Sequence, residues 1–318
     1  FDTMRVLITG AAGFIGTNMT KRLLEEGHSV TGTDNLYCSS ERNYKQFLPN
    51  PNYTFIKHDI RDSLEDLFRE PFDQIFNFAC PASPPNYQRD PLYTLDTCTN
   101  GLVNVLELAT KMHAKVLQAS TSEIYGDPLE HPQKESYRGN VNIFGVRACY
   151  DEGKRVGETF CFNYNKSKNT RIKVIRIFNT YGPFMDPGDG RVISNMVMQG
   201  LRGGDITVFG DGNQTRSFQY IDDLIEGIIR VMATEDDFIG PINLGNPSEF
   251  TIKEFAELIL EMTGNKSKIV RKDLPLDDPK KRKPDISLAK EKLDWEPKIE
   301  LKNGLEKTIE YFRNLENL

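Results

Sequence analysis

The feature that most constrains the fold of this sequence is the segment TGAAGFIG at residues 9–16. It follows a β-branched run at residues 5–9 and opens a stretch with helical periodicity. Gly10, Gly13 and Gly16 permit a tight turn, a close approach of backbone to phosphate, and close packing of helix on strand. The segment predicts a βα unit whose helix N-terminus can hold a pyrophosphate, although a purely structural βα turn has the same pattern.

The first half of the sequence alternates short apolar runs with helical segments, which predicts a parallel sheet covered by crossover helices. The predicted strands are residues 5–9, 29–33, 54–58, 74–78, 115–119 and 173–178. The predicted helices are residues 13–26, 100–112 and 150–168. Segments 81–91 and 126–145, rich in Pro, Gly, Asn and Tyr, are expected to be long loops. The fold class is therefore α/β, with a doubly wound parallel sheet.

A carboxylate at the end of the second predicted strand extends the dinucleotide pattern. Asp34 lies 18 residues after Gly16, near the spacing of about 20 expected for a group that grips the adenosine ribose. A carboxylate there repels a 2′-phosphate, and no basic residue follows before Arg42, which favours NAD over NADP. Asp59 and Ile60, after the third strand, could hold the adenine edge, with a loop cap as the alternative for Asp59.

Tyr150 and Lys154 are the candidates for the chemistry, because a spacing of four places them on one face of a helix. A nearby ammonium favours the phenolate of a tyrosine, whose ordinary pKa is about 10. Similar pairs begin at Tyr53 and Tyr164, so spacing alone does not decide. Tyr150 is distinguished by its position, after the long loop that follows the strand at residues 115–119.

Three polar residues leave that strand at its carboxyl end, where open α/β sheets place their ligands. Thr121 and Ser122 carry hydroxyls that could bind a reacting sugar hydroxyl, and Glu123 is a candidate acid, base or orienting group. The alternative for the two hydroxyls is helix or turn capping. We expect these residues and Tyr150 to share one site.

Long motifs give the sequence a resemblance to a known family. The segments CPASPPNYQ, STSEIYGDP, HPQKESYRGNVN, RACYDEGKR, RIFNTYGP, DGRVISN and QTRSFQY resemble the UDP-glucuronic acid decarboxylases, or UDP-xylose synthases, among the extended short-chain dehydrogenases/reductases. The similarity runs from about residue 4 to residue 312. It implies a Rossmann-type sheet with a smaller C-terminal substrate-binding lobe, bound NAD, a UDP-glucuronate substrate and a homodimer built on the helices at 100–112 and 150–168.

The resemblance also implies roles for the candidate residues. Tyr150 would take the proton of the sugar 4-hydroxyl, with Thr121 hydrogen-bonded to the 4-oxygen while the hydride passes to NAD. Lys154 would hold the ribose and lower the pKa of Tyr150. Glu123 and Arg282 would orient the carboxylate and manage protonation at C5 after carbon dioxide leaves. Return of the hydride to C4 would then give UDP-xylose.

Related reactions provide the alternatives. The 4,6-dehydratases carry an aspartate where this chain has Ser122, and 4-epimerases typically lack the glutamate that Glu123 supplies. Two further interpretations remain: a related decarboxylase that forms a 4-keto-pentose, and a catalytically impaired protein that only binds nucleotide sugars.

The remaining expected contacts complete the site. Further cofactor contacts are expected at Phe14, Ile15, Asn35, Thr97, Ala119, Thr180 and Arg191, the last with the diphosphate as an alternative. Substrate contacts are expected at Tyr87, Asn104, Asn179, Arg216 and Tyr220. Arg282 belongs to the basic run 280–283, which composition alone would assign to a solvated face.

The sequence departs from the family pattern in two places. Asp96 stands where the family usually has a lysine that reaches the sugar, so a cation near the glucuronate is missing. We expect Asp96 to repel the substrate, or else to turn outward or pair with a neighbour such as Lys111. Ser39 and Ser40 replace the usual Gly-Arg after Asp34.

Composition narrows the partners and the environment. A net charge of −6 argues against a nucleic-acid backbone binder. Five cysteines without a C-x-x-C pair predict neither a disulfide framework nor a metal site and favour a reducing, cytoplasmic environment. We expect no membrane segment, with an anchor preceding these residues left open. The expected domains are residues 1–178, which bind NAD, and 179–318, which bind the UDP-sugar, with about 220–246 returning to the sheet.

Overall fold

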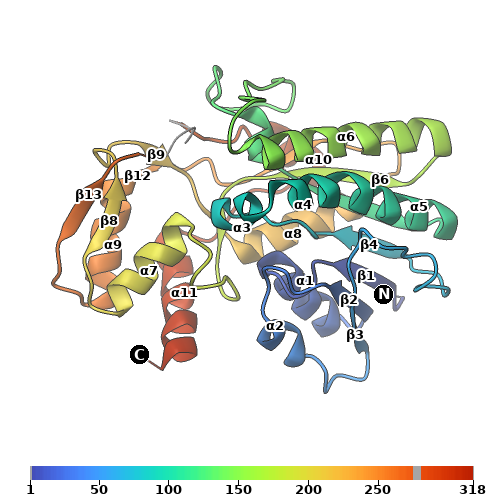
Figure 1. The fold of residues 1–318 in the computed structure, drawn as a ribbon, viewed down its shortest axis with the longest axis horizontal. Coiled ribbons are helices and arrows are strands. Elements are labelled where there is room, and N and C mark those ends of the chain that lie inside the picture. The colour runs from blue at the N-terminus through green and yellow to red at the C-terminus, as the bar shows by residue number, and fades with distance from the viewer. Residues whose placement is uncertain (1, 275–280, 318) are drawn as a thin grey trace.

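The computed structural model describes residues 2–274 and 281–317 and centres on a parallel sheet of seven strands (Figure 1). The order across the sheet is β11-β6-β5-β4-β1-β2-β3. Its strands are β1 (Arg5–Thr9), β2 (Ser29–Asp34), β3 (Tyr53–Lys57), β4 (Gln74–Asn77), β5 (Lys115–Thr121), β6 (Ile172–Ile177) and β11 (Ile242–Leu244). The order reverses between β1 and β4, which is where such sheets bind ligands. The predicted α/β class is confirmed.

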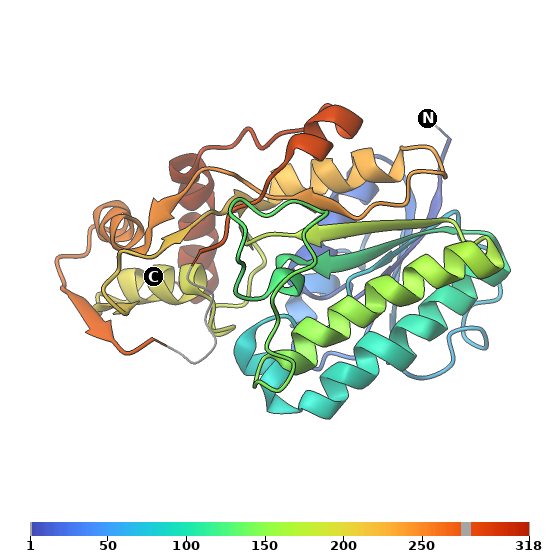
Figure 2. The same cartoon turned by 90° about the horizontal axis from the view of Figure 1, so that it is seen from above.

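Helices cover both faces of the sheet, which explains why its central strands read as continuous apolar runs. On one face α1 (Phe14–Glu25) packs beside α8 (Ile221–Met232). On the other, α5 (Leu102–Met112) and α6 (Ala148–Lys168) run side by side, as Figure 2 shows from above. A π-helical turn, η1 (Thr97–Gly101), leads into α5.

Segment 81–91, expected to be a loop, instead forms helix α3 (Pro84–Arg89) and the start of α4 (Pro91–Asp96). Each of these helices begins with a proline at its first position, where proline's missing N–H and fixed φ suit a helix start. The Asp90 side chain also accepts a hydrogen bond from the Tyr93 backbone and caps α4. The prolines that suggested a loop therefore mark helix starts.

A smaller lobe lies beside the carboxyl ends of the strands (Figure 1). Its short strand pairs are β7 (Thr180–Tyr181) with β10 (Gln219–Tyr220), β8 (Ile206–Phe209) with β13 (Ile269–Lys272), and β9 (Thr215–Arg216) with β12 (Phe250–Thr251). The remaining helices of the described chain are α2 (Glu41–Lys45), α7 (Val192–Leu201), α9 (Ile252–Thr263), α10 (Ser287–Leu293), α11 (Leu301–Glu316) and the 3-10 turn η2 (Ser122–Tyr125).

One apolar core joins the sheet to this lobe. Buried side chains from β1, α1 and α8 belong to the same cluster as those of α7, α9 and α11. A second cluster lies under α5 and α6 on the opposite face. The shared core fixes the lobe against the strand ends, so residues of both halves can line one cavity. Among the described residues, no helix is long and apolar enough to cross a membrane.

Candidate active site

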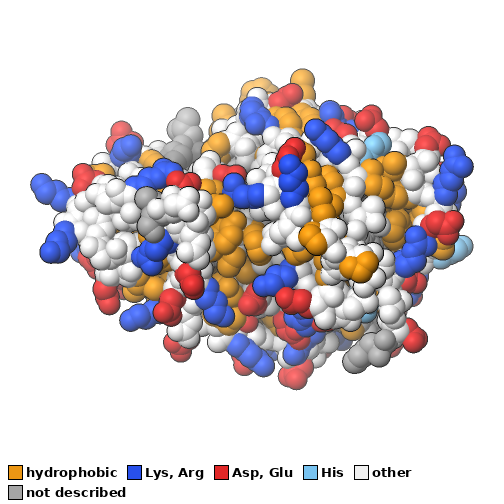
Figure 3. Space-filling view, turned by 90° about the horizontal axis from the view of Figure 1, so that it is seen from below, with side chains coloured by type: hydrophobic (Ala, Val, Ile, Leu, Met, Phe, Trp, Pro, Cys, Tyr) orange, Lys and Arg blue, Asp and Glu red, His pale blue; other side chains and the backbone are white. Residues whose placement is uncertain are grey.

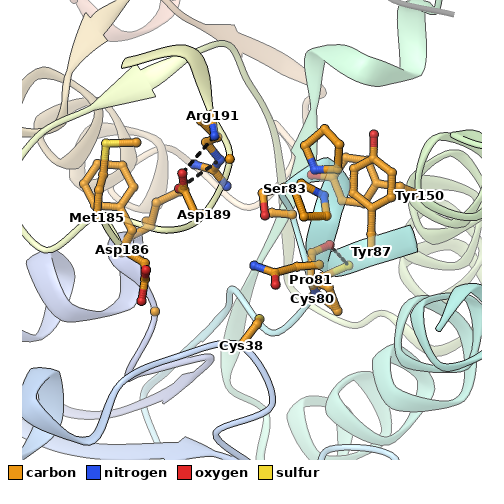
Figure 4. A pocket seen from close by; sticks show the side chains of 18 of the residues that line it. Cys38, Cys80, Pro81, Ser83, Tyr87, Tyr150, Met185, Asp186, Asp189 and Arg191 are labelled. Atoms are coloured by element: carbon orange, nitrogen blue, oxygen red, sulfur yellow. Dashed lines mark hydrogen bonds and ion pairs between the residues drawn. The ribbon is translucent and has the colours of Figure 1, made fainter. Parts of the chain in front are cut away.

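A cavity of about 1090 Å³ lies between the strand ends and the smaller lobe. Hydrophobic side chains gather in the middle of the face seen in Figure 3, with charged side chains beside them and around the rim. Figure 4 shows Tyr150 and Tyr87 on one side of the cavity and Asp189 with Arg191 across from them. The chain therefore presents one large site built from residues distant in sequence.

The glycine turn forms one end of the cavity. Gly10 has φ +67°, and a Cβ there would lie 2.6 Å from the Phe78 carbonyl carbon at the end of β4. A Cβ on Gly16 would overlap the backbone of Gly10. Gly13 is the N-cap of α1 and has no side-chain cap, which leaves the first N–H groups of this helix available to an anion. Phe14 and Ile15 line the same end.

Asp34 ends β2 and accepts three hydrogen bonds. Its carboxylate receives them from the Ala12 and Leu36 amides at 3.0 and 2.8 Å and from the Ser39 hydroxyl at 2.8 Å. Burial raises its pKa, and these hydrogen bonds oppose that shift. Ser39, one of the two departures, thus helps to orient the carboxylate proposed for the ribose.

Beyond Asp34, two tyrosines that the sequence analysis did not identify form an aromatic wall. The rings of Tyr37 and Tyr93 stack with centroids 4.0 Å apart, Arg89 lies over Tyr37, and Arg61 lies over Tyr93. Both tyrosines line the cavity. The two arginines cover the outer faces of this stack, so the ring edges are what the tyrosines present to the cavity.

Polar groups continue this end of the cavity. Asn35 donates to Asp59 at 2.9 Å and to the Tyr93 hydroxyl at 2.6 Å. Burial would raise the pKa of Asp59, but hydrogen bonds from Arg61 outweigh it and lower the pKa. Ile60 and Thr97 also line the cavity. The segment after β3 therefore lines this end of the cavity, and its contact with the adenine remains a prediction.

Tyr150 and Lys154 lie together on α6, one turn apart and both buried. The Tyr150 ring stacks on Tyr87 with centroids 4.8 Å apart, and its hydroxyl is hydrogen-bonded to Thr121. The Lys154 Nζ donates to the Ala119 carbonyl oxygen at 2.9 Å, at the end of β5. Strand β5 and helix α6 thus bring the hydroxyls of Tyr150 and Thr121 and the ammonium of Lys154 to the carboxyl end of β5.

The ionisation of Tyr150 differs from the expectation of a lowered pKa. Burial raises the pKa of the Tyr150 phenol, the negative charge of Cys80 raises it further, and the hydrogen bond to Thr121 opposes this shift. The Lys154 Nζ is 5.8 Å from the ring centroid, directed at Ala119 instead of the phenol oxygen. In this arrangement Lys154 does not set the pKa of Tyr150.

Glu123 lies between two arginines. Its two carboxylate oxygens accept from Arg282 and Arg147, each at 2.9 Å. Burial alone would raise the pKa of Glu123, but the charges of Arg282 and Arg147 lower it to about 2. Glu123 is therefore a fixed carboxylate at neutral pH. Arg147 belongs to the RACYDEGKR motif, although its spacing gave no sign of this contact.

Arg282 is buried in the site rather than solvated. Its guanidinium donates to the Ser122 hydroxyl at 2.8 Å, to Glu123, and to the Gly126 carbonyl oxygen at 3.0 Å. Arg282 and Ser122 are 160 residues apart in the sequence, and they meet because the chain returns from the smaller lobe to η2. Lys280, at the start of the same basic run, lies outside the described residues.

The expected substrate residues divide into two groups. Tyr87, Asn179, Arg216 and Arg191 line the cavity, together with Thr180. Asn104 does not, because its side chain donates to the Ile60 and Asp62 carbonyl oxygens in the segment after β3. Tyr220 packs edge-on against Tyr181 in the core, also outside the cavity lining. The expectation of substrate contact at these two positions is corrected.

Asp96 also lies outside the cavity lining. Its carboxylate pairs with Arg61 at 3.4 Å and accepts from Asn100 at 2.5 Å, and the side chain is 36% exposed. Lys111, the suggested partner, pairs with Glu65 instead. The expected repulsion of the sugar is corrected, because Asp96 turns toward the surface and toward a cation.

Comparison with known proteins gives the chain close relatives over almost its full length. The family profile described as GDP-mannose 4,6 dehydratase matches residues 7–308. UDP-glucuronic acid decarboxylase 1 of Xenopus tropicalis is 49% identical over 312 residues, covering 98% of this chain and 73% of the relative. UDP-glucuronic acid decarboxylase 6 of Arabidopsis thaliana is 50% identical over 313 residues, covering 98% and 90%.

Solved structures of nucleotide-sugar enzymes share the fold. UDP-glucose 4-epimerase of Thermotoga maritima, with UDP-glucose, is 30% identical, with a TM-score of 0.89 and coverage of 98% of this chain and 99% of the other. UDP-glucuronic acid 4-epimerase of Bacillus cereus, in complex with UDP-glucuronic acid and NAD, is 27% identical, with a TM-score of 0.88 and coverage of 98% and 100%.

Proposed function

We propose that this chain, which belongs to the GDP-mannose 4,6-dehydratase family and within it to the UDP-glucuronic acid decarboxylases, converts UDP-glucuronate to UDP-xylose with bound NAD. The observation that carries the proposal is the grouping of Tyr150 and Thr121 with the Arg282–Glu123–Arg147 cluster at one end of the cavity. The hydroxyls of Tyr150 and Thr121 suit oxidation at a sugar hydroxyl. The arginines of the cluster place positive charge where it can bind the carboxylate of the substrate.

The residues present fit NAD. The uncapped N-terminus of α1 behind Gly13 would hold the pyrophosphate, and Asp34 would hold the ribose. The edges of the stacked Tyr37 and Tyr93 rings would border the adenine. Ala119, Thr180 and Arg191 line the far end, where the nicotinamide would lie. Bound NAD⁺ would accept the hydride from C4 of the sugar and return it after decarboxylation.

The protein's own groups handle the proton and the negative charge. Tyr150 takes the proton of the 4-hydroxyl as C4 becomes a ketone, and this requires its phenolate, which the hydrogen bond from Thr121 and the charge of Arg191 favour against burial. Thr121 can then donate a hydrogen bond to the 4-oxygen. The ketone lies β to the carboxylate, so the electrons of the C5–C6 bond pass to the 4-oxygen when carbon dioxide leaves, giving an enolate. The hydroxyls of Tyr150 and Thr121 stabilise this charge by hydrogen bonding. The enolate then takes one proton at C5 from water, which re-forms the ketone, and Tyr150 returns its proton to the 4-oxygen as C4 is reduced.

Glu123 takes a narrower role than the sequence suggested. With a pKa of about 2 it holds no proton at neutral pH, so it is not the acid that protonates C5. It instead holds Arg282 and Arg147 in position through two hydrogen bonds of 2.9 Å. The net positive charge of this triad attracts the substrate carboxylate before decarboxylation and orients it.

We further propose a homodimer through the outer faces of α5 and α6. Val156 and Phe162 of α6 are 36% and 52% exposed, and Leu92 of α4, a helix packed on α6, is 76% exposed. Such side chains favour contact with a second apolar face. Sedimentation of the protein at micromolar concentration tests this: a mass of one 36.3 kDa chain would exclude the dimer.

Incubation with UDP-glucuronate and NAD, followed by NMR of the nucleotide sugar, tests the activity. We expect UDP-xylose without accumulation of NADH, because the hydride is returned. A 4-keto-pentose with stoichiometric NADH would indicate the related 4-keto-forming decarboxylase. UDP-galacturonate would indicate a 4-epimerase.

A further inference from the structure

Two cysteine thiols lie in contact beside the Tyr150 site. The Sγ atoms of Cys80 and Cys98 are 3.4 Å apart, and Cys80 is also 3.2 Å from the Pro81 carbonyl oxygen. Cys80 follows β4 and lines the cavity, whereas Cys98 belongs to η1 and is buried. Figure 4 shows Cys80 and Pro81 between Cys38 and Tyr150. The mechanism proposed above uses neither thiol.

The other three cysteines show no such pairing. Cys38 lines the same cavity, but burial raises its pKa to about 12. The Cys149 Sγ lies 3.6 Å from the Tyr87 carbonyl oxygen, and Cys161 is fully buried on the inner face of α6. All five cysteines belong to the described residues, and among these Cys80 and Cys98 make the one thiol–thiol contact.

We propose that Cys80 and Cys98 form a redox-active dithiol, which a hydroperoxide converts to a disulfide that slows the enzyme. The geometry carries this inference, since two thiols already in contact need only a small approach to reach the S–S bond length of about 2.05 Å. The inhibition, though not the disulfide, rests on the proposed decarboxylase function. In a reducing compartment such a disulfide would be transient and regulatory rather than structural.

The chemistry balances with hydrogen peroxide as oxidant. The Cys80 thiolate attacks one oxygen, the O–O bond breaks, and the departing hydroxide takes a proton to become water. Cys80 is then a sulfenic acid. The Cys98 sulfur attacks the Cys80 sulfur, the S–O bond breaks, and the hydroxide leaves as water with the Cys98 proton. Two thiols and one peroxide thus give one disulfide and two waters.

The surroundings favour Cys80 as the attacking group. The hydrogen bond from Cys98 lowers the pKa of Cys80 to about 7, burial opposes this shift, and the charge of Lys154 assists it. A thiol of this pKa is substantially ionised at neutral pH, and the thiolate is the nucleophile. The cavity gives a small oxidant access to Cys80.

The disulfide would disturb the catalytic helix. Closing the gap from 3.4 Å requires an approach of about 1.4 Å between the two sulfurs. Cys98 is held tightly, because a Cβ added at Gly153 of α6 would lie 3.0 Å from its Cβ and Sγ. To form the disulfide, the loop of Cys80 and Pro81, which lines the cavity, must therefore move. The alternative is a shift of Cys98 that displaces α6 between Tyr150 and Lys154.

Peptide mapping tests the disulfide directly. Trypsin separates the two cysteines, since Arg89 divides peptide 70–89, which contains Cys80, from peptide 90–111, which contains Cys98. After treatment with hydrogen peroxide we expect these peptides to be cross-linked and to separate on reduction. Cys38→Ser is the matched control and should cross-link as the wild type does, whereas Cys98→Ser should not.

Activity is then compared before and after peroxide within each protein. Since a displacement of about 1 Å at an active site can cost about 10²-fold, we expect a loss of about tenfold or more in wild type and Cys38→Ser, restored by dithiothreitol. Cys80→Ser should keep its own starting activity. Absence of the cross-link in wild type, or a cross-linked enzyme with unchanged turnover, would overturn the proposal. A protein that cross-links but never decarboxylates UDP-glucuronate would refute the proposed function alone.

Discussion

Replacing Glu123 with glutamine tests the arginine cluster, because it removes one negative charge while keeping the shape of the side chain. Glu123 is 17% exposed and accepts from two arginines. Its pKa is about 2 rather than 4.5, and each tenfold change in an acid constant corresponds to about 1.4 kcal/mol. The folded state therefore favours the carboxylate by about 3 kcal/mol, similar in size to the cost of breaking other buried ion pairs.

The pH dependence identifies this charge. The folded-state pKa is depressed, so the stabilisation is present above about pH 4.5 and is lost as the pH falls toward 2. Urea denaturation should show Glu123→Gln less stable than wild type by about 3 kcal/mol at pH 7, with a smaller difference at pH 3. The matched control is Glu41→Gln, which removes an exposed carboxylate paired with Lys45 and should change stability little.

Kinetics complete the test of the cluster. With Arg282 and Arg147 no longer held by Glu123, we expect kcat for UDP-glucuronate to fall, while the affinity for UDP alone, which has no sugar carboxylate, stays nearly unchanged. A Glu123→Gln protein as stable as wild type at pH 7, or a stability difference that does not shrink in acid, would refute the reasoning.

Three further substitutions test neighbouring parts of the account. Tyr150→Phe keeps the ring stacked on Tyr87 but removes the phenol, so turnover should fall by at least about 10²-fold with UDP binding retained; near-normal turnover would place the base elsewhere. Asp96→Lys should leave KM for UDP-glucuronate unchanged, because Asp96 pairs with Arg61 outside the cavity lining; a lower KM would show that it senses the sugar. Burial, followed by the charge of Glu123, raises the pKa of Asp151 to about 7. Wild type therefore loses stability as the pH rises from about 4 to 7, and Asp151→Asn should become more stable relative to it over that range. A stability difference that does not change with pH would contradict this.

The sequence was most informative where local pattern and packing coincide. Strands β1 and β5 are buried on both faces, so their apolar runs were visible without any partner. Gly10 was equally readable, because its positive φ and its contact with Phe78 both exclude a side chain. The glycine turn could therefore be recognised from its spacing, whereas Tyr150 was distinguished from Tyr53 and Tyr164 only by its position after the loop that follows β5.

Contacts between distant segments could not be read in this way. Arg282 entered through the family resemblance, and only the folded chain shows it bound to Ser122, 160 residues away. Arg147 stood inside a recognised motif, but its bond to Glu123 depends on the path of the loop between them. Asp96 was assigned to the sugar, whereas the packing of α4 against the segment after β3 gives it Arg61.

The cysteine pair was missed for a related reason. Cys80 and Cys98 are 18 residues apart in sequence, a spacing with no known meaning. They meet because β4 and η1 bring them to the same side of the sheet, beneath α6. Composition pointed away from a structural disulfide framework, but it could not reveal two thiols in contact.

Isotope tracing in UDP-glucuronate most directly tests the central claim, that this site oxidises C4, releases C6 and returns the hydride. The substrate carries deuterium at C4 and carbon-13 at C6, and the reaction is followed by NMR in deuterated water. We predict carbon-13 dioxide and a UDP-xylose that keeps deuterium at C4 and gains one deuteron at C5. A sugar that retains the carbon-13 label, or a xylose that has lost its C4 deuterium to solvent, would contradict the account.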